Sequence, residues 1–314
     1  GLRILVDCAN GAASATAPEL FGRFKAHTVF LHRDPDGVNI NDHCGSTHLE
    51  VLAAQVKEGG YDVGVAFDGD ADRCLLVDET GGVIDGDKVM AVCALDMKRR
   101  GILRGNAIVA TVMSNLGLHE FCRNHGIDLV CTAVGDRNVL EEMLRRDFRV
   151  GGEQSGHTIF TALETTGDGQ VTALQFLQVL ARSGKKASEL AGVCASYPQI
   201  LINVEVPHSG GVKEQIMASQ ELAEAVRQQG DALNGEQKQM LTEQYGFDYE
   251  HILNFNAHNH SAPHWGDNPA PRGKKPEDQA RAEIEYGKTV MAGIHKAIQG
   301  AIANQKPARY GFGT

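Results

Sequence analysis

The sequence is poor in proline and tryptophan and rich in glycine. Its 314 residues include 9 prolines, 1 tryptophan and 36 glycines. Such a composition is typical of tight backbone turns beside ligands, and it excludes proline-rich low-complexity linkers. Hydrophobic residues make up 42% and charged residues 22%, a balance that allows a buried core and excludes general disorder. At about 100–200 residues per domain, the length predicts two or three domains.

Membrane segments, a signal peptide and paired cysteines are also absent. No apolar run approaches the roughly 18 residues of a membrane-spanning helix. The opening GLRILVDCANG lacks the charged, apolar and cleavage regions of a signal peptide. The 7 cysteines include no Cys-x-x-Cys pair, and Cys8, Cys74, Cys93 and Cys131 lie in apolar runs where we expect core positions. These absences predict a soluble, cytoplasmic protein in a reducing compartment, without a membrane partner.

Acidic residues outnumber basic ones. There are 40 Asp and Glu against 30 Lys and Arg, which gives a formal net charge of −10. A nucleic-acid partner requires a basic surface, so this charge disfavours one. A negative net charge is compatible with acidic clusters that hold a cation, and also with a homo-oligomer.

Strand and helix patterns alternate along the first 180 residues, as in a parallel sheet covered by helices. We expect strands at 2–8, 28–32, 63–67, 107–112, 129–133 and 158–160, and a hairpin of 75–77 with 83–84. We expect helices at 16–24, 49–57, 87–100, 116–124, 138–146 and 168–180. A third unit starts with a strand at 200–206 and a helix at 212–228. After Glu236 the pattern changes to a loop followed by a helix at 284–303.

The segment DGDADR carries three carboxylates in alternation. If the loop is extended, Asp68, Asp70 and Asp72 share one face and converge on one point. Three unpaired anions repel one another, and their hard oxygen atoms favour Mg²⁺ as the neutralising cation. Arg73 adds a fixed positive charge beside the metal, as phosphoryl chemistry requires.

Three other interpretations of this loop remain open. In an EF-hand, Glu79 would stand at the twelfth position, but Arg73 replaces the required glycine and the flanking segments are typical of strands. In an aspartyl-phosphate phosphatase, Asp68 would be the nucleophile. A solvated acidic turn is the third alternative, although an apolar strand precedes the loop.

The segment GGEQSGH is the second candidate site. Gly151 and Gly152 would let the backbone of a turn approach a ligand closely. Glu153 and Ser155 offer an acceptor and a donor for sugar hydroxyls, and His157 is able to exchange a proton near neutral pH. The alternative is a capping or hairpin turn with an incidental histidine.

DGDADR followed by GGEQSGH resembles the phosphohexomutase family, and within it the bacterial phosphoglucosamine mutases. Further stretches match in family order: LVDCANGAAS, NINDHCGSTH, IDGDKVM, TVMSNLG, VGDRNVLEEM and TTGDGQVTALQ. The resemblance covers residues 1 to about 236, and Gly1 falls where the family's second domain begins.

The resemblance implies an α/β fold with two tandem phosphohexomutase-type α/β/α domains, a truncated third unit and an irregular or helical C-terminal tail. The implied boundaries are 1–103 for the metal-loop domain, 104–197 for the sugar-loop domain, 198–236 for the start of domain IV, and 237–314 for the tail. The implied activity is an isomerase of the phosphotransferase type. It interconverts glucosamine 6-phosphate and glucosamine 1-phosphate, with glucosamine 1,6-bisphosphate as intermediate, on the route to cell-wall precursors.

The resemblance also assigns roles to individual residues. It makes Asp68, Asp70 and Asp72 the Mg²⁺ ligands and places Arg73 and His157 at the phosphoryl transfer. It assigns the hydroxyls of the phosphorylated hexosamine to Glu153 and Ser155. Gly135, Asp136 and Arg137 form a smaller loop of the same kind and are further candidates for substrate binding, with an incidental turn as the stronger alternative.

Two parts of the family pattern do not appear. The first domain, with its active serine, is missing, and Ser14, Ser46 and Ser114 stand in other motifs. The phosphate-gripping loop of the last domain is also missing, because the pattern stops after Glu236. We therefore expect little or no mutase activity from this chain alone, and the alternative is a catalytically silent piece that binds Mg²⁺ and a phosphosugar.

The tail has a separate resemblance. HILNFNAHNHSAPHW and ANQKPARYGFGT are similar to parts of the first domain of neutral ceramidase-like proteins, a family of zinc amidohydrolases. The resemblance implies that His258 is a Zn²⁺ ligand and His260 a transition-state partner, so that a zinc-dependent amidohydrolase fragment is a third interpretation of function. A histidine-rich surface loop with adventitious metal affinity is the alternative for residues 237–314.

Overall fold

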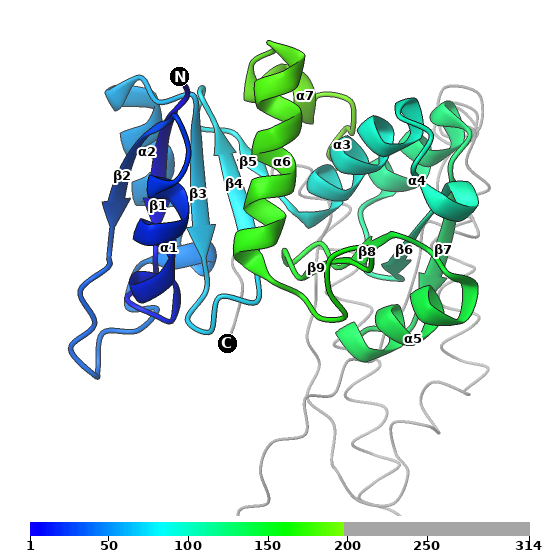
Figure 1. Cartoon of the computed structure of the whole chain (residues 1–314), viewed down its shortest axis with the longest axis horizontal. Coiled ribbons are helices and arrows are strands. Elements are labelled where there is room, and N and C mark those ends of the chain that lie inside the picture. The colour runs from blue at the N-terminus through cyan, green and yellow to red at the C-terminus, as the bar shows by residue number, and fades with distance from the viewer. Residues whose placement is uncertain (198–314) are drawn as a thin grey trace, which may run out of the picture. The chain divides into compact units, whose positions relative to one another are not determined.

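The computed structural model describes residues 1–197, and this part of the chain contains two sheets with helices on their faces (Figure 1). The first sheet has the strand order β2-β1-β3-β4-β5. Its strands are β1 (Arg3–Asp7), β2 (His27–Leu31), β3 (Val63–Phe67), β4 (Cys74–Asp78) and β5 (Val83–Ile84). β1 pairs in parallel with β2 and β3, and β3, β4 and β5 follow one another antiparallel.

The second sheet repeats this plan with fewer strands. Its order is β7-β6-β8-β9, with β6 parallel to β7 and β8, and β9 antiparallel to β8. The strands are β6 (Ala107–Thr111), β7 (Asp128–Thr132), β8 (Val150–Gly152) and β9 (Thr158–Phe160). The antiparallel strands β4 and β5 thus extend the parallel core of the first sheet, and β9 alone extends that of the second.

Seven α-helices accompany these sheets within residues 1–197. They are α1 (Ala13–Gly22), α2 (Glu50–Gly59), α3 (Gly86–Arg99), α4 (Leu116–His125), α5 (Asp136–Arg146), α6 (Gly169–Ser183) and α7 (Ala187–Ala191). Single 3-10 turns, η1 (Gly45–Thr47) and η2 (Arg104–Asn106), lie in the loops. None of these helices is long and apolar enough to cross a membrane.

The two faces of the first sheet belong to different hydrophobic clusters, because successive strand residues point to opposite sides. Leu5 and Val77 face α2, where Leu52 and Val56 complete a small cluster. Ile4, Val6 and their equivalents on β3 and β4 face the other side and join the main core.

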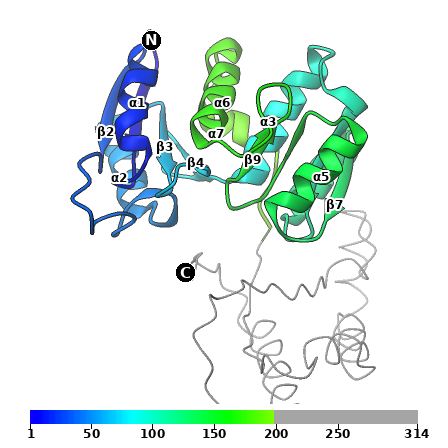
Figure 2. The same cartoon turned by 60° about the horizontal axis from the view of Figure 1, so that its bottom comes forward.

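Helix α6 connects this main core to the second sheet. Figures 1 and 2 show α6 between the two sheets, where its apolar side chains Phe176, Leu177 and Leu180 join a single cluster. That cluster contains residues of β1, β3 and β4 on one side and of β6 and β8 on the other, together with α3. The two sheets therefore share one continuous hydrophobic core.

The strands and helices that were expected within residues 1–197 all appear there, with ends shifted by a few residues. Two local predictions are wrong. Gly151 and Gly152 belong to strand β8 and not to a turn; a β-carbon on Gly151 would lie 2.5 Å from Met143 Sδ, so this glycine accommodates a packed side chain. Cys131 is exposed, because β7 is an edge strand of its sheet, whereas Cys8, Cys74 and Cys93 are buried as expected.

The main chains of the two hairpins meet directly. The amide of Cys74, at the start of β4, donates a 3.1 Å hydrogen bond to the carbonyl of Gly156, in the β8–β9 loop. Gly156 has φ +100°, and a β-carbon there would lie 2.6 Å from the Cys74 carbonyl oxygen. Only glycine meets both requirements, the positive φ and the close approach.

We predict that Gly156→Ala destabilises the protein more than Gly101→Ala. Gly101 also has a positive φ, of +69°, but nothing lies within 4 Å of its missing β-carbon. The control variant Gly101→Ala should therefore lose only about 1–2 kcal/mol of the free energy of unfolding, the cost of a left-handed backbone for alanine. Gly156→Ala should lose roughly 2 kcal/mol more, because its β-carbon overpacks the contact with Cys74. Urea unfolding midpoints measure both, and equal losses would show that the contact between the hairpins is unimportant.

Candidate functional site

The acidic loop connects β3 to β4, and the structure brings its three carboxylates together. One oxygen from each of Asp68, Asp70 and Asp72 lies within 4.8 Å of the others. The loop is a tight turn and not the extended segment that we expected: the amide of Ala71 donates to the Asp68 carbonyl at 3.1 Å, and Ala71 has φ +63°. The carboxylates converge because the chain turns, and not because alternate residues share a strand face.

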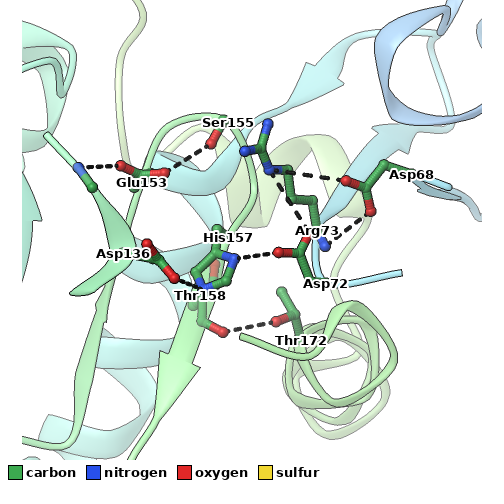
Figure 3. Close-up of polar contacts among 10 residues, drawn as sticks. Asp68, Asp72, Arg73, Asp136, Glu153, Ser155, His157, Thr158 and Thr172 are labelled. Carbon is green, nitrogen blue, oxygen red and sulfur yellow. Dashed lines mark hydrogen bonds and ion pairs between the residues drawn. The ribbon is translucent and has the colours of Figure 1, made fainter. Parts of the chain in front are cut away.

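Arg73 lies between two of these carboxylates. Its Nε is 3.9 Å from Asp68 Oδ2 and 3.8 Å from Asp72 Oδ1, and its amide donates to Asp68 Oδ1 at 3.1 Å (Figure 3). The side chain is 42% exposed. A positive charge is thus held at the mouth of the loop with part of its surface open to a ligand.

The charges of the loop are not balanced by the protein alone. Burial is the main cause that raises the pKa of Asp68 to about 7, and the negative charges of Asp72 and Asp70 raise it further. The amide and the guanidinium of Arg73 act in the opposite direction and lower this pKa. Asp72 Oδ1 is buried without a hydrogen-bond partner. A divalent cation bound by oxygen atoms fits this donor set, because it would neutralise the carboxylates and occupy the orphaned oxygen.

The predicted sugar-binding side chains stand in the loop between β8 and β9. Glu153 Oε1 accepts from the amide of Gly135 at 3.1 Å, and Glu153 Oε2 accepts from Ser155 Oγ at 3.4 Å. Gly135 precedes α5 and has φ +120°. Glu153 therefore connects the two loops of the second sheet that were expected to bind substrate.

His157 links this loop to the acidic loop. It is 4% exposed, its Nδ1 lies 3.0 Å from Asp72 Oδ2, and its Nε2 lies 3.9 Å from Asp136 Oδ2 (Figure 3). Gly167 packs on the ring, since a β-carbon there would lie 2.4 Å from Nε2. The imidazole is thus fixed between a carboxylate of the metal loop and one at the start of α5.

Residues that sequence reasoning did not single out support this arrangement. Gln154 Nε2 donates to Asp85 Oδ2 at 3.2 Å, and the Gly86 amide donates to the Gln154 carbonyl at 3.0 Å. Asp87, 1% exposed, accepts from the Asn115 amide at 2.6 Å. The only sequence signal for these contacts was the match of IDGDKVM to a family motif.

Three predicted residues are not brought into this cluster by the described structure. Arg137 is 85% exposed and pairs with Glu141 on its own helix, at 2.7 Å. The tail residues His258 and His260 lie outside the described residues, as do the third unit and the helix predicted at 284–303.

Family models match both sheets with their helices. The model for phosphoglucomutase/phosphomannomutase, alpha/beta/alpha domain II, matches residues 1–82, and the model for domain III matches residues 85–197. Together they account for more than half of the chain.

The curated relatives compared with the chain are phosphoglucosamine mutases. The chain is 52% identical over 231 residues to a phosphoglucosamine mutase of Rhodococcus erythropolis, covering 74% of this chain and 52% of the relative. It is 54% identical over 206 residues to a phosphoglucosamine mutase of Ruminiclostridium cellulolyticum, covering 66% and 46%. The chain spans about half the length of the curated relatives it matches.

Solved structures share the fold. A phosphoglucomutase/phosphomannomutase family protein of Burkholderia thailandensis superposes with a TM-score of 0.57 at 26% identity, covering 63% of this chain and 44% of that one. An Aspergillus fumigatus N-acetylphosphoglucosamine mutase, solved with GlcNAc-6P and magnesium, superposes with a TM-score of 0.53 at 20% identity, covering 69% and 57%.

We predict that Asp70→Asn weakens Mg²⁺ binding, because it removes one charged oxygen donor from the cluster. The loss should be at least about tenfold, the smallest effect typical of removing even an outer partner of a metal ligand. Isothermal titration calorimetry with MgCl₂ measures it. Glu58→Gln, which removes an exposed carboxylate on α2, is the control and should leave the affinity unchanged; an equal loss in both variants would contradict a defined site.

We also predict that Asp87 makes the stability depend on pH. Burial, and next the charge of Asp85, raise the pKa of Asp87 to about 7, opposed by the Asn115 amide and the Ser114 hydroxyl. The folded chain then holds a proton that the unfolded chain has released above about pH 4, so the free energy of unfolding falls as pH rises from about 4 to 7.

The contribution of Asp87 is up to about 1.4 kcal/mol for each pH unit in that window. Asp87→Asn has no ionisable group at position 87. The free energy of unfolding of this variant, relative to that of the wild type, should therefore increase as pH rises from about 4 to 7 and remain constant above pH 7. Denaturant unfolding of both proteins at several pH values measures the difference. Parallel curves would show that Asp87 is not protonated in the fold.

Proposed function

Because the chain belongs to the phosphoglucomutase/phosphomannomutase family, we propose that it supplies the metal and sugar sites of a phosphoglucosamine mutase reaction. That reaction interconverts glucosamine 6-phosphate and glucosamine 1-phosphate, with the 1,6-bisphosphate as intermediate. The observation that carries the proposal is the bond between His157 and Asp72, which joins the sugar loop to the metal loop. A phosphosugar that contacts both loops would place its phosphoryl group at the acidic loop and its hydroxyl groups at the sugar loop.

Phosphoryl transfer depends mainly on positioning and on neutralising the charge of the transferred group. In the proposed mechanism Asp68, Asp70 and Asp72 would hold Mg²⁺, which when bound would supply positive charge to the phosphoryl group. Arg73 adds a permanent cation that no proton loss removes. Its position between Asp68 and Asp72 keeps the guanidinium beside the metal ligands.

The sugar loop orients the hexosamine. Glu153 accepts hydrogen bonds from sugar hydroxyls, and Ser155 donates or accepts one, while the Gly135 amide keeps the Glu153 carboxylate in place. His157 lies buried between Asp72 and Asp136, where its imidazole holds the metal loop and the sugar loop in place beside the phosphoryl transfer.

A second function is supported by the same two loops. The carboxylates of the acidic loop and the side chains of Glu153 and Ser155 are suited to bind Mg²⁺ and a phosphosugar without turnover. We place either activity in the cytoplasm, a proposal supported by the seven cysteines, all of which are unpaired thiols.

We predict that the 314-residue chain binds glucosamine 6-phosphate in the presence of Mg²⁺. Glu153→Gln should weaken this binding about tenfold, because it removes a charged hydrogen-bond acceptor worth roughly 1.4 kcal/mol or more. NMR line broadening of the sugar phosphate measures the affinity, with Glu58→Gln as the control.

The product distinguishes the two functions. Formation of glucosamine 1-phosphate after addition of glucosamine 1,6-bisphosphate supports the mutase, whereas binding without product supports the silent binding protein. Absence of binding, or equal binding by Glu153→Gln, would contradict both.

A further inference from the structure

A second group of metal-binding side chains lies outside the site described above. Asp7 is the last residue of β1, His32 directly follows β2, and Cys44 precedes the turn η1. A carboxylate oxygen, an imidazole nitrogen and the thiol sulfur of these residues lie within 4.8 Å of one another. All three stand at the carboxyl edge of the parallel strands, where α/β proteins bind ligands.

The cluster is mostly buried and held in place by the backbone. Asp7 is 1% exposed and Cys44 is fully buried, whereas the side chain of His32 is 32% exposed. Asp7 Oδ1 accepts from the Ala9 amide at 2.9 Å, and Asp7 Oδ2 accepts from the Gly45 amide at 3.1 Å and lies 2.9 Å from His32 Nδ1. The carboxylate thus has a fixed orientation, and His32 provides the route to solvent.

The backbone around the cluster is unusually strained. Within residues 1–197, eight non-glycine residues have a left-handed φ, and five of them lie in or near the cluster: His32 itself and its neighbours Ala9, Asn10, Asn41 and His43. Asparagine and histidine adopt this region more readily than other residues, so the clearest strain is at Ala9, of the order of 1 kcal/mol.

We propose that Asp7, His32 and Cys44 form a Zn²⁺ site, distinct from the oxygen-only cluster of Asp68, Asp70 and Asp72. Thiolate and imidazole are ligands that Zn²⁺ prefers, whereas Mg²⁺ prefers oxygen alone. Three protein ligands leave one tetrahedral position for water, on the side where His32 is exposed. The proposal does not depend on the mutase function.

Binding is an exchange of protons for the metal. The thiol of Cys44 loses its proton to solvent, and His32 carries its remaining proton on Nε2 so that Nδ1 is free to bind. Two anionic ligands then balance the charge of Zn²⁺, which makes the buried complex neutral. With zinc–ligand bonds of about 2.0–2.3 Å, ligand atoms stand roughly 3.3–3.8 Å apart, so His32 Nδ1 and Asp7 Oδ2 need only a small separation from 2.9 Å.

Zinc at this site would stabilise the segment between His32 and Cys44, which lies next to the acidic loop. A β-carbon on Gly45 would lie 2.6 Å from the carbonyl oxygen of Phe67, the residue before Asp68, and one on Gly69 would lie 2.7 Å from Asn41 Nδ2. The segment between His32 and Cys44 therefore packs directly against the acidic loop, and zinc would tie both its ends to β1.

Cobalt provides the direct test, since a Co²⁺–thiolate bond gives an intense near-ultraviolet charge-transfer band that oxygen and nitrogen ligands do not give. Titration of the full chain with CoCl₂ should produce this band with one equivalent of metal, and Zn²⁺ should abolish it. Histidines of the tail do not confuse the result, because no cysteine follows Cys194 in the sequence.

Two variants assign the band. Cys44→Ser should abolish it and His32→Gln should weaken binding at least about tenfold, while Cys131→Ser, which removes the exposed thiol, should leave it intact. Absence of the band from the wild type, or its loss in Cys131→Ser with retention in Cys44→Ser, would overturn the proposal.

A stability measurement covers the case of a variant that folds poorly. One equivalent of Zn²⁺ should raise the thermal unfolding midpoint of the wild type and of Cys131→Ser, and leave that of Cys44→Ser unchanged. An unchanged midpoint in the wild type, or the same rise in all three proteins, would also contradict a site at Cys44.

Discussion

The direct contact between two backbones, at Cys74 and Gly156, is the constraint on which the rest of the site depends. Cys74 comes immediately after the acidic loop and Gly156 immediately precedes His157, so this 3.1 Å hydrogen bond fixes the spacing of the two loops. The same approach lets His157 reach Asp72. Glycine is required at this crossing, and any larger residue there would separate the metal loop from the sugar loop.

Buried acidic groups have two different functions in the molecule. At the acidic loop, partial burial and mutual repulsion leave carboxylates that a cation would stabilise. At the start of α3, Asp85 caps the helix by accepting from the Lys88 amide, and Asp87 is held by the Asn115 amide. The first group is arranged to receive a ligand, and the second group joins α3 to the loops on either side, so acidity alone does not identify a binding site.

The order and type of most elements were predictable from the sequence, because apolar runs and helical patterns alternate along the chain. The exceptions are β8, which was expected to be a turn, and the short helix α7, which was not expected. The convergence of Asp68, Asp70 and Asp72 was also predicted, but for the wrong reason, since the turn at Ala71 depends on a backbone bond that no periodicity encodes. Gly151 was misinterpreted because a sequence does not tell whether a glycine makes room for a ligand or for a side chain such as Met143. The links from Gln154 to Asp85 and among Asp7, His32 and Cys44 join segments far apart in the chain, so only the fold reveals them.

The position of α6 in the chain has a consequence for folding during protein synthesis. Strands β1 to β5 are complete by Ile84, but one face of their sheet is covered by side chains of α6, which extends to Ser183. Domains generally fold in order as they leave the ribosome. Here the part of the first sheet that packs on α6 must wait, with apolar residues of β4 such as Leu76 uncovered, until roughly another hundred residues have emerged. The interval in which this nascent chain needs protection by chaperones is therefore set by the second sheet, and not by the first.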